Sequence, residues 1–441
     1  MTVKQSGGLA WLALMGATAC LGASKDAGSF RLVPYPEKYG PPIGLVEGAP
    51  GVFYTNGGAA DPIVFSVTAL GSSVMLATLP AGQYIQAPLV AAANGRFYSS
   101  MAHRLDPVRM FSIGAPPGAL EVYDPRPVDP MPVENLPDGS LLGISATLAA
   151  NPVYSLVRCG LDGNVTPLDE FPAGERLPHT ALYATDGSYY GVSMLQDGSG
   201  YVYALKPPGN LKKLTSFPAN SMHGLFAYVP LLEGEDGNLY GATTTGGPQR
   251  GGTIYKLSTS GQYTLLHNLP HEKQSFSPSA LIEASDGNLY GMTLGEESEL
   301  FRVTKSGQFT VLYTLDMLHE GRCPCQLIQA SDGNLYGTAS MGGTMGQGGI
   351  FVWNAGLPKP RPKPLEFHPT SAGPGAEVLI WGSNLLSARV SFNGIPAAHV
   401  SAIGPNYVRA TVPAGATSGP LTISTPGGST KTRTSLQVVK P

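Results

Sequence analysis

The sequence predicts an all-β protein: a seven-bladed β-propeller over residues 28–355, followed by an immunoglobulin-like β-sandwich over residues 365–439. Three observations lead to this prediction. A short phrase recurs at regular intervals, each copy is flanked by strand-like stretches and tight-turn residues, and a proline-rich run precedes a last segment of different composition. We therefore expect two bodies that are built from strands.

The recurring phrase is DGNLYG, which is complete at residues 236–241, 286–291 and 332–337. Looser copies bring the number to seven. We call the fifth position of the phrase the slot; it is aromatic in all copies but one and falls at Tyr54, Tyr98, Leu142, Tyr190, Tyr240, Tyr290 and Tyr336. The slots are 44 to 50 residues apart, which is the length of a four-stranded propeller blade. Helical repeats are excluded because no copy carries apolar residues at helical spacing.

Residues 279–315 show how one blade is built. Four stretches that suit strands (ALIEA, LYGMT, ELFRVT and FTVLYTL) are joined by the tight turns SDGN and KSGQ and by one longer connection. Gly adopts a positive φ without steric cost and Asp bonds to nearby backbone, so Asp-Gly predicts a hairpin turn. A calcium ligand is the alternative role for the Asp, but no copy has the D-x-[DN]-x-[DN]-G run of a calcium loop. We expect a turn former.

The two ends of the repeat array complement each other. The seventh copy stops at a proline-rich run before its fourth strand, whereas residues 28–42 resemble a fourth strand with its following loop. Pairing the first strand with the last blade would leave no open sheet edge. We predict that the ring is closed in this way.

The long connections of each copy join the second strand to the third and one blade to the next. Because strands alternate in direction, these connections emerge on one face, where we expect recognition. Substitutions there should abolish binding without unfolding the protein. A tight-turn substitution such as Gly287→Val should unfold it.

Composition excludes one class of partner. Charged residues make up 13% of the chain and the net charge is −3, so the sequence has no basic surface for nucleic acid. We expect a monomer that binds an extracellular protein or a glycan.

Residues 1–19 read as a signal peptide. Lys4 is followed by an apolar stretch that is too short to cross a bilayer and by small residues before Cys20. We therefore expect an extracytoplasmic protein. Residues 17–20, A-T-A-C, resemble a bacterial lipobox, in which Cys20 would be lipidated, although the usual Leu is replaced by Ala17. The alternatives are a surface lipoprotein, touching the membrane only through that lipid, and ordinary cleavage with secretion.

The other cysteines do not form a disulfide framework. Cys323 and Cys325 are too close to pair without strain, and we place them in the loop that enters the seventh blade. Together with Cys159, we expect them to be free or strained thiols. We expect no metal and no cofactor, because the further ligands that a zinc site needs are missing.

The proline-rich run, residues 356–364, predicts a stiff spacer, which would hold the two bodies roughly 25 Å apart if fully extended. In the segment that follows, PTSAGPGAEVLIWGSNL, VSFNGIPA, VPAG and GPLTISTPGG resemble an IPT/TIG domain, an immunoglobulin-like module of secreted and cell-surface proteins. The repeats, with DGNLYG and GGTIYKLSTSGQYTLL, resemble the extracellular GloVer tandem-repeat proteins. That resemblance implies a surface protein without a known activity.

No catalytic motif was found: the sequence lacks G-x-S-x-G, H-E-x-x-H and a phosphate-binding G-K-[ST] loop. We therefore expect no catalytic residues, and a binding or scaffold protein that acts through the long connections. The alternative is a propeller enzyme similar to streptogramin lyases, whose repeats also have a D-G turn before an aromatic strand, although Trp is common where this chain has Tyr.

Four histidines fall in the connections that enter consecutive blades: His179, His223, His271 and His319. They would lie along one arc of the long-connection face, where their imidazoles could converge on a metal or an anionic ligand. Their uneven distances from the repeated Asp favour ordinary surface residues instead.

Overall fold

The structure is a computed structural model of the chain. It describes residues 28–57, 62–102, 108–114, 118–123, 128–147, 152–195, 199–217, 229–270, 275–295, 297–316, 318–320, 322–342 and 348–439. Cys20 and the predicted signal peptide lie outside these ranges. Within them all regular elements are strands apart from the 3₁₀ turn η1 (Glu37–Tyr39), and no helix is long and apolar enough to cross a membrane.

In the described residues between 29 and 354, the strands form seven antiparallel sheets, which we number in chain order. Sheet 1 contains β2 (Val46–Ala49), β3 (Val52–Gly57), β4 (Ile63–Thr68) and β5 (Ser73–Thr78), and sheet 2 contains β6 (Tyr84–Ile85), β7 (Val90–Ala91), β8 (Phe97–Ala102), β9 (Arg109–Ile113) and β10 (Leu120–Val122). Sheet 3 contains β11 (Val128–Asn135), β12 (Leu141–Thr147), β13 (Tyr154–Cys159) and β14 (Val165–Glu170), and sheet 4 contains β15 (Glu175–Tyr183), β16 (Tyr189–Leu195), β17 (Gly200–Leu205) and β18 (Lys212–Phe217).

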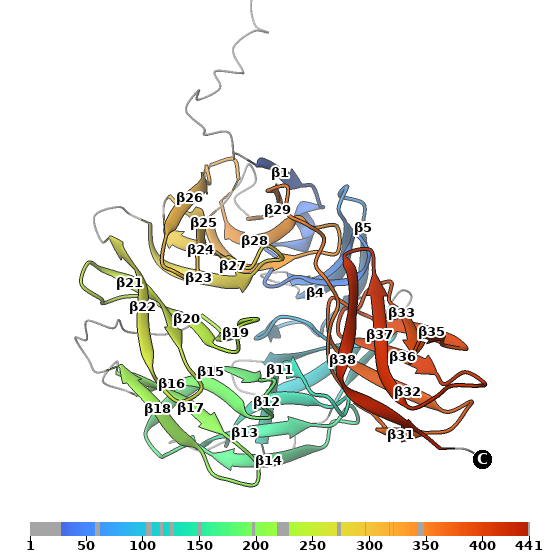
Figure 1. The fold of residues 1–441 in the computed structure, drawn as a ribbon. Helices are drawn as coiled ribbons and strands as arrows, with labels where there is room; N and C mark the ends of the chain where they lie inside the picture. The colour runs from blue at the N-terminus through green and yellow to red at the C-terminus, as the bar shows by residue number, and fades with distance from the viewer. Residues whose placement is uncertain are drawn as a thin grey trace, which may run out of the picture.

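Sheet 5 contains β19 (Leu232–Glu233), β20 (Leu239–Thr243), β21 (Arg250–Leu257) and β22 (Tyr263–Pro270). Sheet 6 contains β23 (Ser275–Glu283), β24 (Leu289–Gly295), β25 (Glu299–Val303) and β26 (Phe309–Thr314), and sheet 7 contains β27 (Arg322–Gln329), β28 (Leu335–Met341), β29 (Gly349–Asn354) and β1 (Ser29–Val33). The sheets follow one another around a common centre in a propeller-like arrangement (Figure 1). We call residues 29–354 the repeat region.

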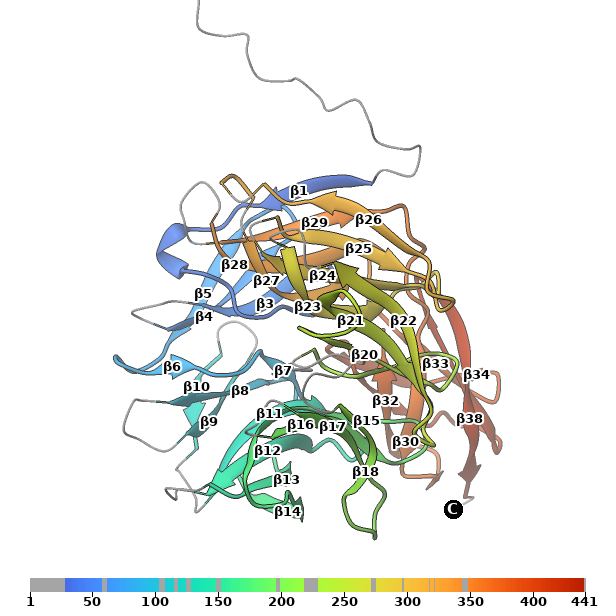
Figure 2. The same ribbon diagram turned by 90° about the vertical axis from the view of Figure 1, so that its left-hand side faces the viewer.

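The predicted closure is confirmed. β1 pairs with β29 in register from Ser29↔Asn354 to Val33↔Ile350, so the start of the repeat region completes its last sheet. Figure 2 shows β1 lying beside β29. The Phe30 ring stacks on Tyr313 of sheet 6, with centroids 4.5 Å apart, and this contact ties the closing strand to the neighbouring sheet as well.

The phrase DGNLYG forms the turn between the first and second strands of a sheet. In the copy at 286–291, Asp286 Oδ1 accepts the backbone N–H of Asn288 at 3.1 Å and Asp286 Oδ2 accepts the Tyr290 hydroxyl at 2.9 Å. The same bonds recur at Asp236 and Asp332. Aspartate and tyrosine are therefore fixed four residues apart because one carboxylate satisfies the turn and the slot hydroxyl together, as expected of a turn former.

The slot residues also hold neighbouring sheets together. The Tyr336 ring of sheet 7 lies 4.3 Å from the Phe53 ring of sheet 1, and the Tyr54 ring lies 4.2 Å from the Phe97 ring of sheet 2 (centroid distances). Aromatic pairs at these separations stabilise a packed interface beyond their buried area. The core thus lies between the sheets all the way around the repeat region.

Two cysteine predictions have different outcomes. Cys159 is a buried free thiol, and burial raises its pKa to about 12. The prediction that Cys323 and Cys325 lie in a loop is wrong, because both fall within β27, where Pro324 pairs with Ala339. The proline and the bulge beside it interrupt the ladder without ending the strand.

After residue 354 the chain forms two more sheets, which we call the C-terminal unit (residues 363–438). One contains β30 (Lys363–His368), β32 (Glu377–Ser383), β36 (Tyr407–Thr411) and β35 (His399–Ile403); the other contains β31 (Ser371–Ala372), β38 (Gly428–Val438), β37 (Gly419–Thr425), β33 (Arg389–Phe392) and β34 (Ile395–Pro396). Both sheets contribute to one apolar core that includes Ile380, Phe392, Val408 and Ile423.

The expected separation of the two bodies is wrong. Proline-rich residues 356–364 run along the repeat region, where the Pro358 carbonyl accepts the Ser285 hydroxyl at 2.6 Å and Pro360 is buried. The C-terminal unit, orange to red in Figure 1, packs against sheets 2 to 4. The segment, which we call the bracket, is therefore held on the repeat region by its Pro358 carbonyl, which also accepts a bond from Gln329 at 3.2 Å.

Candidate functional site

One position in each sheet of the repeat region decides how the sheet meets its neighbours. It is the residue at or near the end of the first strand that pairs with the residue before the slot, and we call it the clasp position. It is occupied, in chain order, by Glu47, Ala91, Asn135, Tyr183, Glu233, Glu283 and Gln329. All seven positions lie on the side where first and second strands are joined, which we call the turn side.

In four sheets this side chain binds the turn of the preceding sheet, an interaction that we call the clasp. Glu283 accepts the backbone N–H of Glu235 at 2.8 Å, and Gln329 accepts that of Ser285 at 2.8 Å. Glu233 accepts the Thr185 N–H at 2.9 Å, and Glu47 of sheet 1 accepts the Ser331 N–H at 2.7 Å. Four consecutive joints, from sheet 4 round to sheet 1, are therefore closed by hydrogen bonds to turn amides.

The other three clasp positions contact the C-terminal unit or lie beneath it. The Tyr183 hydroxyl donates to Glu366 at 3.0 Å, and the Tyr183 ring meets the Trp381 ring edge-on at 5.5 Å. Trp381 and Tyr407 of the C-terminal unit form an apolar cluster with Ala93, which follows Ala91 in the turn of sheet 2.

Polar contacts reinforce this docking. The Tyr407 hydroxyl donates to the Leu136 carbonyl of sheet 3 at 2.7 Å, and Arg409 donates to the Ala93 carbonyl at 3.2 Å. In sheets 2 to 4 the clasp position does not bind the turn of the preceding sheet, and these are the sheets on which the C-terminal unit lies.

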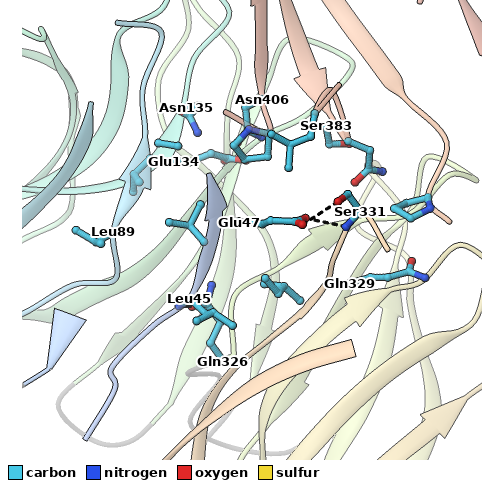
Figure 3. A pocket seen from close by; sticks show the side chains of 18 of the residues that line it. Leu45, Glu47, Leu89, Glu134, Asn135, Gln326, Gln329, Ser331, Ser383 and Asn406 are labelled. Carbon is cyan, nitrogen blue, oxygen red and sulfur yellow. Dashed lines mark hydrogen bonds between the residues drawn. The ribbon is translucent and has the colours of Figure 1, made fainter. Parts of the chain in front are cut away.

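A cavity of about 310 Å³ lies on the turn side between the repeat region and the C-terminal unit (Figure 3). The first strands of sheets 1, 2, 3 and 7 form one wall, with Leu45, Leu89 and Ile328 as apolar surface. Loops of the C-terminal unit form the other wall, through Ser383, Asn384, Leu386, Pro405, Asn406 and residues 425–427. Neither part of the chain encloses this space alone.

Two carboxyl groups line the cavity. Burial raises the pKa of Glu47 even though the N–H groups of Gly51 and Ser331 oppose the shift; Figure 3 shows Glu47 directed toward Ser331. Burial also raises the pKa of Glu134 to about 8, with a bond from the Tyr183 N–H at 2.7 Å opposing it and the negative charge of Glu233 adding to it. Glu134 is therefore mostly protonated at neutral pH.

Several polar atoms around the cavity are not used within the described residues. Asn135 is 7% exposed and its Oδ1 is buried without a hydrogen-bond partner. Asn384 and Asn406 each donate one amide N–H, to the carbonyls of Arg361 and Gly382 respectively, both at 3.1 Å, and their Oδ1 atoms can accept further bonds. The groups around the cavity that can still form hydrogen bonds therefore include three amide oxygens.

The four predicted histidines are only partly described. His223 and His271 lie outside the described residues. His179 falls within β15 rather than in a connection, and its side chain is not among those described. His319 is exposed, with Nδ1 2.6 Å from Asp316 Oδ2. Among the described residues no group of three His, Cys, Asp or Glu side chains could hold a metal ion, and convergence of the four histidines stays a prediction.

Sequence reasoning missed the cavity residues. A signal was present: the clasp position is acidic or Gln in four copies and Ala, Asn or Tyr in the other three. Aligning the copies on the slot would have separated the two groups.

Comparison with known proteins supports the repeat assignment. The model of a family described as the Gloeobacter/Verrucomicrobia repeat matches residues 133–356. No curated protein sequence matches the chain.

The chain also resembles several solved structures at low sequence identity. YCF48 bound to a D1 peptide has a TM-score of 0.50 and 13% identity, over 74% of this chain and 95% of that one. A fungal alcohol oxidase of the AA5 family in complex with copper has a TM-score of 0.48 and 13% identity, over 93% and 99%. PQQ-bound aldose sugar dehydrogenase from Streptomyces coelicolor has a TM-score of 0.41 and 16% identity, over 75% and 99%. The likeness to YCF48 supports a propeller-like fold and nothing about activity.

Proposed function

The chain belongs to the Gloeobacter/Verrucomicrobia repeat family, and we propose that it is an exported binding or scaffold protein. In this proposal the seven sheets are the blades of a seven-bladed β-propeller, and the C-terminal unit is an IPT/TIG-type immunoglobulin-like domain. Residues 1–19 direct export, and Cys20 either carries a lipid at the cell surface or follows ordinary cleavage. The partner is an extracellular protein or glycan, which a monomer binds.

The observation that carries the proposal is the position of the C-terminal unit. It sits on the turn side, over sheets 2 to 4, through Tyr183, Trp381 and Tyr407. Because neighbouring strands are antiparallel, the connections between second and third strands and between sheets emerge on the opposite side. That side is left for a partner, and connections held on a rigid scaffold suit recognition.

Two connections on that side show how residues are presented; of the second, residues 315–316 and 318–320 are described. The one after β20 turns back through a Gly246↔Gly251 bridge. The one after β26 is fixed by Glu320, which accepts the Asp316 N–H at 2.9 Å and the Tyr313 hydroxyl at 2.6 Å. Leu318 is 66% exposed and lies next to the exposed His319, so the anchored connection presents one apolar and one polar side chain. We propose both as contact residues.

Binding to a glycan array and to a panel of peptides and macrocycles tests the proposal, with product analysis on every positive. Retention without product supports a binding protein. Turnover would overturn it in favour of the enzyme alternative similar to streptogramin lyases. If contact runs through the described loop, Leu318→Ala and His319→Ala weaken retention at least tenfold, whereas Glu377→Gln, an exposed carboxyl on the C-terminal unit, leaves it unchanged.

A further inference from the structure

We propose that the cavity between the repeat region and the C-terminal unit is a second ligand site, and that it takes an aliphatic primary amine: an ammonium group on an alkyl chain. This site is separate from the long-connection side and does not depend on the function proposed for it. The volume of about 310 Å³ is within the range of small-molecule sites, roughly 300 to 1,000 Å³. Interfaces between two structural units are also where such sites commonly occur.

The unused hydrogen-bonding groups indicate a ligand that donates. Asn135 Oδ1 is buried and has no partner, which is uncommon for a buried polar atom. Asn384 and Asn406 also line the cavity; each donates one amide N–H to a backbone carbonyl and offers its Oδ1 as a further acceptor. An ammonium group has three N–H donors and no acceptor, so it matches this arrangement.

Charge points the same way. The residues that line the cavity include Glu47 and Glu134 but no Lys, Arg or His, so nothing among them compensates a bound anion. A cation would stabilise both carboxylates, which burial now disfavours. No aromatic side chain lines the cavity either, so neither a stacked sugar nor a methylated ammonium held by aromatic rings is favoured.

The apolar wall fits the rest of the ligand. Leu45, Leu89, Ile328 and Leu386 line the cavity, and methylene groups are stabilised by contact with such apolar surface. An alkylamine or a lysine side chain combines both requirements. The two sources share one chemistry, and the test separates them.

The decisive measurement is calorimetric titration of the full chain with pentylamine, 1,5-diaminopentane and an acetyl-lysine-amide peptide. Pentanol and pentanoate serve as neutral and anionic controls. We expect an amine to bind with a Kd below about 1 mM and each control at least tenfold more weakly. If a free amine binds more tightly than the lysine peptide, the cavity is a small-molecule site. If the lysine peptide binds more tightly, its natural ligand is a lysine side chain of a protein. Binding of pentanol as tight as that of pentylamine, or no amine binding at about 1 mM, would overturn the proposal.

Two variants and a control locate the site. Glu134→Gln keeps an acceptor for the Tyr183 N–H and should weaken amine binding at least tenfold, while Glu377→Gln should not change it. Pro426→Trp adds bulk at the rim from an exposed turn and tests the site even where Glu134→Gln disturbs folding. Unchanged binding in Pro426→Trp and in a folded Glu134→Gln would exclude this cavity.

A proton readout distinguishes a ligand contact from a structural effect. Glu134 is protonated at about pH 6.5, and an ammonium group beside it should displace that proton, so the binding enthalpy should vary with the ionisation enthalpy of the buffer. The charged or titratable groups that act on Glu134 and its neighbours Tyr183 and Tyr407 are Glu233, Asp138, Glu366, Tyr189 and Arg158. Loss of the buffer dependence in Glu134→Gln assigns the proton to this residue; a dependence that persists there contradicts the assignment.

Discussion

Neighbouring sheets of the repeat region are held together in two different ways. One group of joints runs from sheet 4 through sheets 5, 6 and 7 to sheet 1, and the other runs from sheet 1 through sheets 2 and 3 to sheet 4. In the first group, Glu233, Glu283, Gln329 and Glu47 bind the turn amides of the preceding sheet. In the second, Ala91, Asn135 and Tyr183 make no such bond, and the C-terminal unit covers the turns of sheets 2 and 3 instead. The comparison teaches that a repeat which loses its clasp residue does not simply weaken: the exposed turn becomes a docking surface.

Removing the docking contact should have the largest effect. Trp381 is 4% exposed between Tyr183 and Ala93, and replacing a buried Trp with Ala costs about 3 to 5 kcal/mol. We expect Trp381→Ala to increase amide exchange at the turns of sheets 2 and 3, on which the C-terminal unit lies, but not at the clasped turns around Asp236 and Asp286. Trp353→Ala, in sheet 7, is the matched control. Equal exchange changes in both groups of turns would contradict the distinction.

The docked group should also respond to pH through Glu134. Its pKa is about 8 in the folded chain and about 4.3 when unfolded, so the folded state holds the extra proton between these values. Stability from this group is fully present below about pH 4.3 and falls as pH rises, by up to about 1.4 kcal/mol per pH unit, until about pH 8. We expect the Tm of Glu134→Gln to decline less than that of the natural chain between about pH 5 and 8. Parallel curves would show that Glu134 does not carry the effect.

Breaking a clasp should have a smaller and more local effect. Glu233→Ala removes the acceptor of the Thr185 N–H, and a partly buried donor left unpaired costs about 1 to 3 kcal/mol. Amide exchange should rise at Thr185 and its turn, measured against Glu377→Ala as an exposed control. If the Thr185 amide stays protected, the clasp does not stabilise this joint.

The smallest effect should separate two turn glycines. Gly287 and Gly333 both have a positive φ, 78° and 97°, but a Cβ at Gly287 meets nothing within 4 Å, whereas one at Gly333 lies 2.8 Å from the Leu357 carbonyl oxygen. Gly333→Ala should therefore cost about 1 kcal/mol more than Gly287→Ala in chemical denaturation. The same geometry revises the expectation for Gly287→Val: strain in φ, without a collision, should destabilise the turn rather than unfold the protein. If both substitutions lower the free energy of unfolding equally, the segment at Leu357 must shift to accommodate the added Cβ.

Much of the fold could be predicted because it depends on residues that are close in sequence or at the two ends of the repeat array. Each copy shows its Asp-Gly turn and its slot, such as Tyr240 or Tyr290, and the last copy lacks a fourth strand. The observed sheets and their closure agree with these features. The docking and the cavity could not be predicted in this way. They depend on contacts between residues far apart in sequence, such as Tyr407 with Leu136. A run of prolines is interpreted as a spacer unless it is known that Ser285 donates a hydrogen bond to the Pro358 carbonyl.

The pairing of β1 with β29 also sets an order of events. A chain made from its N-terminus has the strand 29–33 long before residues 349–354 exist, so the closing strand must wait until nearly the whole repeat region has emerged. Until then the backbone edges of sheet 7 and of β1 itself lack their partners, and open edges of this kind invite pairing with other chains. Contacts so distant in sequence form slowly. Closure should therefore be a late step of folding, and the period before it is the one in which this protein has most need of protection from aggregation.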